Sequence, residues 1–441
     1  GKDALTANTT GSYNTAVGRA AANLLTTGSY NIAIGDLALK QNTTGSGNVV
    51  IGYDALQVSS TSDTVAIGRN ALNLNTTGYN NIGIGASALR SCTTGGNNTA
   101  TGYLTMMSLT TGTENTAYGQ RTLKSVTTGI QNTAIGGGCL QNNTGNYNTA
   151  VGRDCLISNT TGQNNTGVGK DALNDSTTAS GCVAVGSNSL LDLTTGSYNS
   201  CVGSGTGSNM TTGTYNTYMG EYAGYGNDST ANTGSYNAFY GARAGQSITT
   251  GQFNVCIGWE AGKGIEDGSG NVCIGPEAGG TGQIESGGSQ LYIARDNAGA
   301  GNGEVWIYGD GNGACKQGNN STSWSTTSDR RLKKNIVDSS KGLAEINQLR
   351  VTNFEYRLKD EIDMSEFPLA NDPKQVVLGG GQEGKVQTGV IAQEVESVIP
   401  ECIDVSVAGA KTVQTDPIMW AMVNAIKELS AKVEELESKL N

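Results

Sequence analysis

The residues best suited to chemistry in this chain are a serine and a lysine in the basic segment SDRRLKKNI. Ser328 stands five residues before Lys333, and the 441-residue chain contains no histidine. A Ser–His–Asp triad is therefore excluded, but a lysine that has lost its proton can act as the base for a serine hydroxyl. Burial and the nearby cations Arg330, Arg331 and Lys334 would lower the lysine pKa from its usual value of about 10.4. The same residues, taken alone, also fit a solvated basic loop.

The basic segment interrupts an acidic chain that carries little charge. The formal net charge is −11, only 15% of residues are charged, and 65 are glycine. The absence of a basic stripe interleaved with aromatic residues argues against a nucleic-acid partner. No apolar run reaches the roughly 20 residues that a membrane helix needs, so we expect no membrane insertion. The nine cysteines include no CxxC pair, so we expect free thiols and neither a metal nor a cofactor.

A repeat of about 17 residues fills positions 1–275. A loosely kept N-x-A-x-G pattern ends at glycines 18, 35, 52, 68, 85, 102, 119, 136, 152, 169, 186, 203, 220, 241, 258 and 275. Nearly every step is 17 residues, with two steps of 16 and one of 21. The opening GKDAL is in the same register, so we expect the chain to begin inside a repeat and to be part of a longer protein. A fixed period of this length is typical of a solenoid.

Each period predicts a short strand, a tight turn, a second short segment and a polar turn. Segments such as NTAVG alternate in the manner of a strand, a small–Leu pair follows three and four residues after the glycine, and NTTG is a turn signal. Stacking such coils in parallel, about 4.8 Å apart, pairs each backbone with the next. Small Ala, Gly and Cys side chains would fill the narrow positions. We expect the continuous core to be a column of β-branched residues, namely Val17, Ile34, Ile51, Ile67 and Ile84.

Two further columns follow from the period. Tyrosines recur at one turn position, where they could stack on sugar rings or form an edge ladder that shields the coils: Tyr13, Tyr30, Tyr147, Tyr198, Tyr215 and Tyr236. Cys256 and Cys273 share one coil position, and Cys139 and Cys155 share another. Their spacing would permit disulfides, but we expect stacked free thiols.

The period decays over residues 276–327, where SQLYIARD and GEVWIYGDGNG still alternate like strands. We expect this junction to end the solenoid in a cap or tip. Trp306 and Trp324, with Trp259 just before, are candidates for surface contact or for plugs at the end of the core.

The units NTAVG, NIAIG and NVCIG resemble the head repeats of trimeric autotransporter adhesins and the shafts of some phage tail fibres. The resemblance implies a left-handed parallel β-roll, three copies of which pack together. The coils of those heads are somewhat shorter than 17 residues.

Residues 328–441 resemble the C-terminal intramolecular chaperone auto-processing domain of phage tail fibres and endosialidase tailspikes. The matching blocks are SDRRLKKNI, LRVTNFEYRL, TGVIAQEVESVIPECI and KTVQTDPIMWAMVNAIKELSAKVEELESKL. The resemblance implies a domain that trimerises, drives folding of the β-structure before it and then cuts itself off. It implies that Ser328 is the nucleophile and Lys333 the general base. It assigns the shaping of the site to Asp329, Arg331 and Asn335. The cut would fall beside the serine, at Thr327–Ser328 or at Ser328–Asp329.

The end of this region has the pattern of helices. In GVIAQEVESVIP, Ile391, Val395 and Val398-Ile399 recur at helical spacing before Pro400, and we assign Gln393 and Glu394 to the helix start and to packing. Over about residues 419–441 the apolar residues then form about three heptads, which predicts a trimeric coiled coil. The predicted seam consists of Met419, Met422, Ile426, Leu429, Val433, Leu436 and Leu440.

These patterns predict a mainly β chain: a homotrimeric parallel β-solenoid followed by a small α+β chaperone domain. The function they indicate is the distal part of a viral tail fibre, assembled in the host cytoplasm and carried on the virion, with a host-surface glycan as receptor. One alternative is a polysaccharide-degrading tailspike, which needs a carboxylate pair in a groove. The acids near the junction lack a recurring motif: Glu260, Glu266, Asp267, Glu277 and Glu285. Another alternative is a bacterial trimeric adhesin, which would need a C-terminal membrane anchor.

Overall fold

The computed structural model divides into two compact units, which are described separately. The first comprises residues 1–311 and 315–322, and the second comprises 312–314 and 323–441. The structure describes residues 1–227, 230–280, 288–294, 305–309, 315–317, 334–357, 361–367, 386–405 and 409–440.

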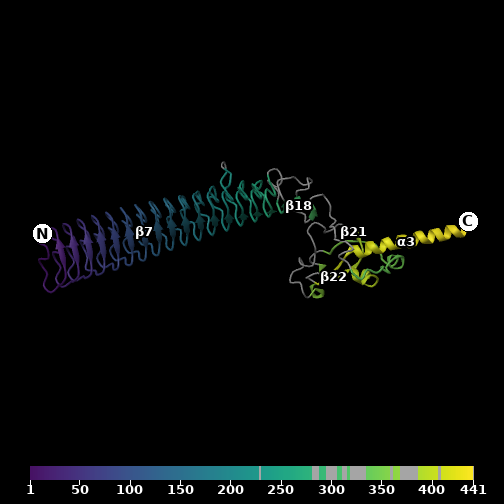
Figure 1. Ribbon diagram of the computed structural model, residues 1–441, viewed down its shortest axis with the longest axis horizontal. Coiled ribbons are helices and arrows are strands. Elements are labelled where there is room, and N and C mark those ends of the chain that lie inside the picture. Colours follow the sequence, from purple (N-terminus) through teal and green to yellow (C-terminus); the bar gives the residue numbers. More distant parts are fainter. Residues whose placement is uncertain are drawn as a thin grey trace. The chain divides into compact units, whose positions relative to one another are not determined.

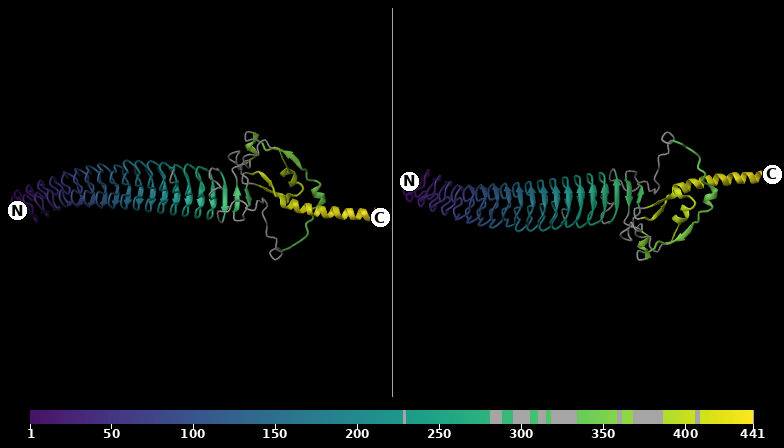
Figure 2. Two further views of the ribbon diagram at one scale, coloured as in Figure 1. Left: turned by 90° about the horizontal axis from the view of Figure 1, so that it is seen from above. Right: turned by 90° about the horizontal axis from the view of Figure 1, so that it is seen from below.

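The first unit is a parallel β-solenoid in which each coil contributes one three-residue strand, and each strand pairs in parallel with the next (Figures 1 and 2). The mainly β class and the coil of about 17 residues are thereby confirmed. The strands are β1 (Thr15–Val17), β2 (Ile32–Ile34), β3 (Val49–Ile51), β4 (Val65–Ile67), β5 (Ile82–Ile84), β6 (Thr99–Thr101), β7 (Thr116–Tyr118), β8 (Thr133–Ile135), β9 (Thr149–Val151), β10 (Thr166–Val168), β11 (Val183–Val185), β12 (Ser200–Val202), β13 (Thr217–Met219), β14 (Ala238–Tyr240), β15 (Val255–Ile257) and β16 (Val272–Ile274).

The strand pairing changes from parallel to antiparallel after the last coil. Strand β17 (Leu291–Ala294) still pairs in parallel with β16, whereas β18 (Val305–Gly309) and β19 (Cys315–Gln317) add to it in antiparallel fashion. The two strand-like segments of the junction therefore do form strands. The side chain of Trp306 and all of Trp324 lie outside the described residues.

The expectation that Val17, Ile34, Ile51, Ile67 and Ile84 form the core is wrong. The middle residue of each strand points inward, so Ala33 and Val50 are buried while Ile34 and Ile51 are each 37% exposed. A three-residue strand has only one inward position, because successive side chains alternate between faces. The coil is too narrow to hold an aromatic residue there unless the opposite wall becomes smaller, and this position is most often Ala.

The opposite wall is a column of leucines. Leu39 and Leu56 are fully buried, and their backbones have φ of 54° and 43°. The second segment of each coil is therefore a run of turns and not a strand, although its backbone still bonds to the next coil, as from Leu39 N to Ala55 O at 3.1 Å. A left-handed non-glycine residue costs about 1–2 kcal/mol, which the roughly 1.5–3 kcal/mol gained by burying a leucine offsets.

Near the end of the solenoid the large residue moves from the leucine wall to the strand, and the small residue moves from the strand to the opposite wall. Tyr218 and Phe239 occupy the inward strand position, fully buried, with ring centroids 4.8 Å apart and planes inclined by 5°. Glycine replaces leucine on the facing wall, where a Cβ on Gly224 or Gly245 would lie 2.3 Å from the ring of Tyr218 or Phe239 respectively. The interior volume is thus conserved while its chemistry changes, as close packing requires.

A buried ladder of asparagines explains the N of the N-x-A-x-G pattern. The side chain of Asn115 donates to Asn98 Oδ1 at 3.1 Å and to the Gly129 carbonyl at 2.8 Å, and its Oδ1 accepts from the Asn132 backbone N–H at 3.0 Å. The pattern repeats from coil to coil, with Thr64 and Cys182 replacing asparagine in two coils. Each asparagine satisfies backbone groups that the turn before the strand would otherwise leave unpaired.

The final glycine of the N-x-A-x-G pattern is required because the backbone of the next coil approaches it closely. Gly18 has φ of 139°, and a Cβ there would lie 2.3 Å from the carbonyl oxygen of Gly35 in the next coil. No other residue fits this corner.

The cysteines whose side chains the structure describes belong to the solenoid interior and to the core of the second unit. Eight cysteines are free and buried, and Cys256 and Cys273 face each other as register partners on β15 and β16. Burial raises the pKa of the Cys92 thiol to about 11. Such thiols stay protonated and unreactive at neutral pH.

The second unit is a small α+β arrangement that ends in one long helix. Its elements are α1 (Leu343–Ile346), β20 (Thr352–Phe354), the 3-10 helix η3 (Met364–Glu366), β21 (Gln387–Gly389), α2 (Ala392–Glu396), the 3-10 helix η5 (Pro400–Cys402), β22 (Ile403–Val405), β23 (Lys411–Val413) and α3 (Thr415–Leu440). Strands β20 and β21 form one antiparallel pair, and β22 and β23 form another.

The core of the second unit contains Val395, Ile399, Cys402 and Ala421. Val395 and Ile399 are both buried, but only Val395 lies in α2, so the helix is shorter than the predicted spacing up to Pro400 implied. Helix α2 ends at Glu396, and Pro400 begins a 3-10 helix. A search of the described helices found none with the length and apolar character of a membrane span.

Candidate functional site

The predicted catalytic residues lie almost entirely outside the described part of the chain. Ser328, Asp329, Arg331 and Lys333 are not described, so their proposed roles stay predictions. Asn335 is described. It is exposed and has φ of 52°, a conformation that asparagine tolerates better than most residues.

The predicted coiled-coil seam lies on one exposed face of α3, the long yellow helix in Figure 1. The side chains are between 44% and 84% exposed, although all seven are large and apolar: Met419, Met422, Ile426, Leu429, Val433, Leu436 and Leu440. A stripe of this kind at heptad spacing is typical of a helix that associates with other helices.

A face of α3 that borders the seam is held by its own unit. Ala421 and Ala425 are buried, Asn424 Nδ2 donates to the Lys341 carbonyl at 3.0 Å, and Glu428 accepts from the Leu343 N–H at 3.2 Å. These contacts fix the rotation of α3 about its axis, so the apolar seam faces away from the core of the unit.

Surface ion pairs tie α2 to its neighbours. Arg350 Nε donates to Glu394 at 3.2 Å, and Lys411 pairs with Glu396. The hydrogen bond from Arg350 lowers the pKa of the exposed Glu394 carboxyl. Glu394 therefore behaves as a charged structural partner in the described structure.

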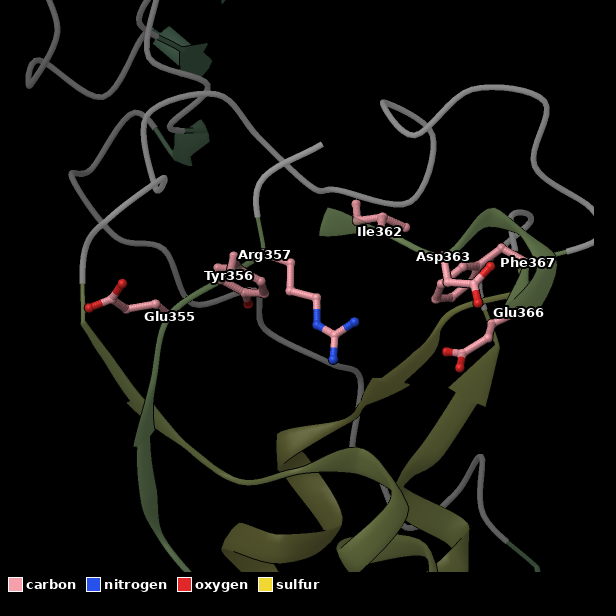
Figure 3. Close-up of a pocket in the computed structure, with 7 residues that line it drawn as sticks. All are labelled: Glu355, Tyr356, Arg357, Ile362, Asp363, Glu366 and Phe367. Atoms are coloured by element: carbon pink, nitrogen blue, oxygen red, sulfur yellow. The ribbon is translucent and has the colours of Figure 1, made fainter. Parts of the chain in front are cut away.

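A cavity of about 300 Å³ lies between the end of β20 and η3 (Figure 3). It is lined by Glu355, Tyr356, Arg357, Ile362, Asp363, Glu366 and Phe367. Asp363 Oδ1 accepts from the backbone N–H of Ser365 at 2.9 Å and from its hydroxyl at 2.7 Å, which lowers the Asp363 pKa. Asp363 is thus a helix cap, and no group of three metal-ligating side chains occurs among the described residues.

The outward residues of the solenoid strands form an uncharged outer strip. We define this strip as the first and third residues of β1 to β16, which include Ile82, Ile84, Val255 and Ile257. All 32 are Thr, Ser, Ala, Val, Ile, Met or Tyr. The sequence pattern did contain part of the signal, because in most of these strands a small residue stands in the middle and larger or β-branched residues flank it.

Most of the tyrosine column forms an edge ladder of stacked rings. The ring centroids of Tyr198 and Tyr215, Tyr215 and Tyr236, and Tyr236 and Phe253 are 5.1, 5.2 and 5.0 Å apart, with nearly parallel planes. Tyr13 and Tyr30 stack in the same way. Because the faces cover one another, the ladder presents mainly ring edges to solvent, which leaves little room for sugar rings to stack on it.

Trp259 lies on the solenoid surface and is not a plug, since its side chain is 49% exposed. Beside it, Glu260 is buried and accepts from Arg243 at 3.1 Å and from Lys263 at 2.8 Å. Burial raises the pKa of the Glu260 carboxyl, but the hydrogen bonds from Lys263 and Arg243 outweigh it and the net shift is downward. The sequence signal for this trio is an arginine 17 residues before the glutamate and a lysine three residues after it.

A repetitive β-solenoid followed by a small α+β unit with an exposed helical seam is the architecture of a fibrous protein that carries a C-terminal chaperone. Residues 328–404 match the model of a peptidase family described as the chaperone of endosialidase. Over these residues the chain is therefore similar to the chaperone of endosialidase, a family classed among the peptidases. Together with the solenoid, the match fits a tail-fibre or endosialidase-type protein.

Proposed function

We propose that this chain is the distal part of a viral tail fibre, which forms a homotrimeric adhesive shaft for attachment to a host surface. The C-terminal chaperone domain folds the shaft in the host cytoplasm and then removes itself by serine–lysine autoproteolysis. The family match that begins at Ser328 carries this proposal. The exposed seam on α3 and the uncharged outer strip support it.

Trimer formation begins at α3. Three parallel copies of the seam form a coiled coil, which brings three identical outer strips to the same starting point. Because the solenoid coils are so alike, three chains could otherwise associate one coil out of register at little cost. Clamping the C-terminal ends meets part of the entropic cost of association before the strips pack.

The self-cleavage needs only the residues of the chain and water. At Thr327–Ser328, Ser328 Oγ attacks the carbonyl carbon of Thr327 while the neutral Lys333 amine takes the hydroxyl proton. The ammonium returns that proton to the leaving amine, and water hydrolyses the ester that remains. The lysine must lose its proton near neutral pH, so its pKa has to lie well below its usual value in the folded trimer.

Mass analysis of the purified protein tests the chemistry. The wild type should release a C-terminal fragment of 114 residues if Thr327–Ser328 is cut, or 113 residues if Ser328–Asp329 is cut. Ser328→Ala and Lys333→Ala should leave the 441-residue chain intact. A fragment of the same mass from Ser328→Ala would refute self-cleavage at this serine.

The oligomer is tested separately. Leu429→Asp places a charge in the seam and should abolish the trimer in sedimentation equilibrium, with loss of the β-solenoid circular-dichroism signal. Glu434→Gln, an exposed position on the same helix but off the seam, is the control and should remain trimeric. A wild-type full-length chain that sediments as a folded monomer would end the proposal.

The described residues give no support to the polysaccharide-degrading alternative. Glu260 is engaged by two cations, and Glu285 lies outside the described residues.

A further inference from the structure

One corner of the solenoid carries an exposed tryptophan that has no aromatic partner at the equivalent position of either neighbouring coil. Trp259 follows the glycine that ends β15, and its equivalents in the coils before and after are Ala242 and Pro276. The bond from the Glu277 N–H to the Trp259 carbonyl, at 2.7 Å, and that from the Glu260 N–H to the Ala242 carbonyl, at 2.9 Å, place these coils side by side. Neither neighbour carries an aromatic ring that could stack on the indole as the tyrosines stack on one another, and Trp259 is 49% exposed.

Fixed hydrogen-bond donors stand beside this face. Glu260, whose side chain is only 9% exposed, is bonded through one oxygen to Arg243 and through the other to Lys263. The side chains of Arg243 and Lys263 are 48% and 38% exposed, so donors remain on their outer sides. An ionised carboxylate underneath them holds both donors in place at little further entropic cost on binding.

The next coil extends the same corner. Tyr222 occupies the position equivalent to Arg243 one coil earlier, and the Arg243 N–H bonds to the Glu221 carbonyl at 2.8 Å. The ring of Tyr222 packs edge-on against Tyr225, with centroids 5.4 Å apart. Three successive coils thus present two aromatic side chains and two anchored cations on one corner.

We propose that this corner, which we call the Trp259 site, binds a neutral hexose unit of a host-surface glycan. The inference rests on the proposed attachment function and names the receptor contact within it. The indole takes the apolar face of the sugar ring, and Arg243 and Lys263 donate to its hydroxyls.

The local charge decides between neutral and acidic sugars. Arg243 and Lys263 are balanced by Glu260, and Glu221 and Glu277 occupy the adjoining coil positions. The corner is therefore not net positive, and the whole chain carries −11. A polyanionic glycan would be repelled, whereas a neutral ring meets no such penalty.

The test is binding of the full-length trimer to an array of immobilised neutral and sialylated oligosaccharides. We expect retention on neutral hexose-containing glycans, at least a tenfold loss in Trp259→Ala, partial retention in Trp259→Phe and weakened binding in Arg243→Gln. Tyr103→Ala is the matched control, because Tyr103 occupies the same coil position, is 47% exposed and has Leu104 beside it in place of a charged partner.

Several results would overturn the assignment. They are retention of acidic glycans only, equal retention by Trp259→Ala and wild type, no retention of any glycan, or dissociation of the trimer in Trp259→Ala, which would make the corner a subunit contact. Trimer formation and self-cleavage are measured on the same samples. If both are intact while Trp259→Ala binds as wild type, only the Trp259 site is wrong, whereas their loss in wild type would count against the proposed function itself.

Discussion

The asparagine ladder yields a prediction whose magnitude follows from its hydrogen bonds. Asn115→Ala removes the donor to the Gly129 carbonyl and the acceptor for the Asn132 N–H. Asn98 Oδ1 keeps its bond from the backbone N–H of residue 115. The substitution therefore strands two buried backbone groups, each of which costs about 1–3 kcal/mol when unpaired, so we expect a loss of about 2–6 kcal/mol.

Amide hydrogen exchange is the suitable assay, because coils contact only their neighbours and the damage should stay local. Since about 1.4 kcal/mol is a factor of ten, protection of the Asn132 amide should fall by at least about 30-fold. The control is Asn142→Ala, at an exposed position outside the ladder, which should leave that protection unchanged. The reverse change, Thr64→Asn, fills a gap in the ladder and should slow exchange at Asn81.

Unchanged protection of the Asn132 amide in Asn115→Ala would refute the reasoning. It would mean that water or a shifted backbone satisfies the two groups, and that the asparagine column contributes little to the solenoid.

Three further predictions concern the walls, the buried carboxylate and the outer strip. Gly224→Ala should destabilise the solenoid by about 1–3 kcal/mol through overpacking against Tyr218, in addition to the cost of a left-handed alanine at φ of 59°. In a double-mutant cycle by chemical denaturation, Tyr218→Ala should remove the overpacking part alone. The pKa of the Glu260 carboxyl in the folded protein lies below its ordinary value of 4.5. The ionised carboxylate therefore stabilises the fold above pH 4.5, and this stabilisation is lost as the pH falls through the folded-state pKa. The difference in Tm between wild type and Glu260→Gln should shrink over that pH range. Ile135→Lys in the outer strip should leave the α3 trimer intact but expose the solenoids to proteolysis, whereas Ser125→Lys, an exposed position off the strip, should not.

Much of the solenoid could be read from the period alone. A 17-residue repeat with one short alternating segment and a glycine-containing turn admits few arrangements other than stacked parallel coils, and the register of β1 to β16 follows the repeat. The heptad repeat on α3 could also be predicted from the sequence, because apolar residues at that spacing fall on one face of a helix whatever surrounds it.

The direction of the strand side chains could not be read in the same way. Alternation shows that Ala33 and Ile34 lie on opposite faces, but it does not show which face is the interior. The leucine wall opposite decides this, because Leu39 already fills much of the narrow coil and leaves room only for a small side chain. That wall depends on left-handed backbone at leucine, which sequence preferences argue against.

The amino-acid sequence by itself determined the repeat, the parallel stacking, the position of the serine and lysine, and the apolar seam, because each depends on local periodicity or on residue type. Only the tertiary structure decided that the β-branched columns face outward, that α3 turns its seam away from its own unit, and that Trp259 is exposed beside the bridged Arg243, Glu260 and Lys263. These features depend on which surfaces meet across coils and helices, and a volume balance between facing walls is not a property of any one segment.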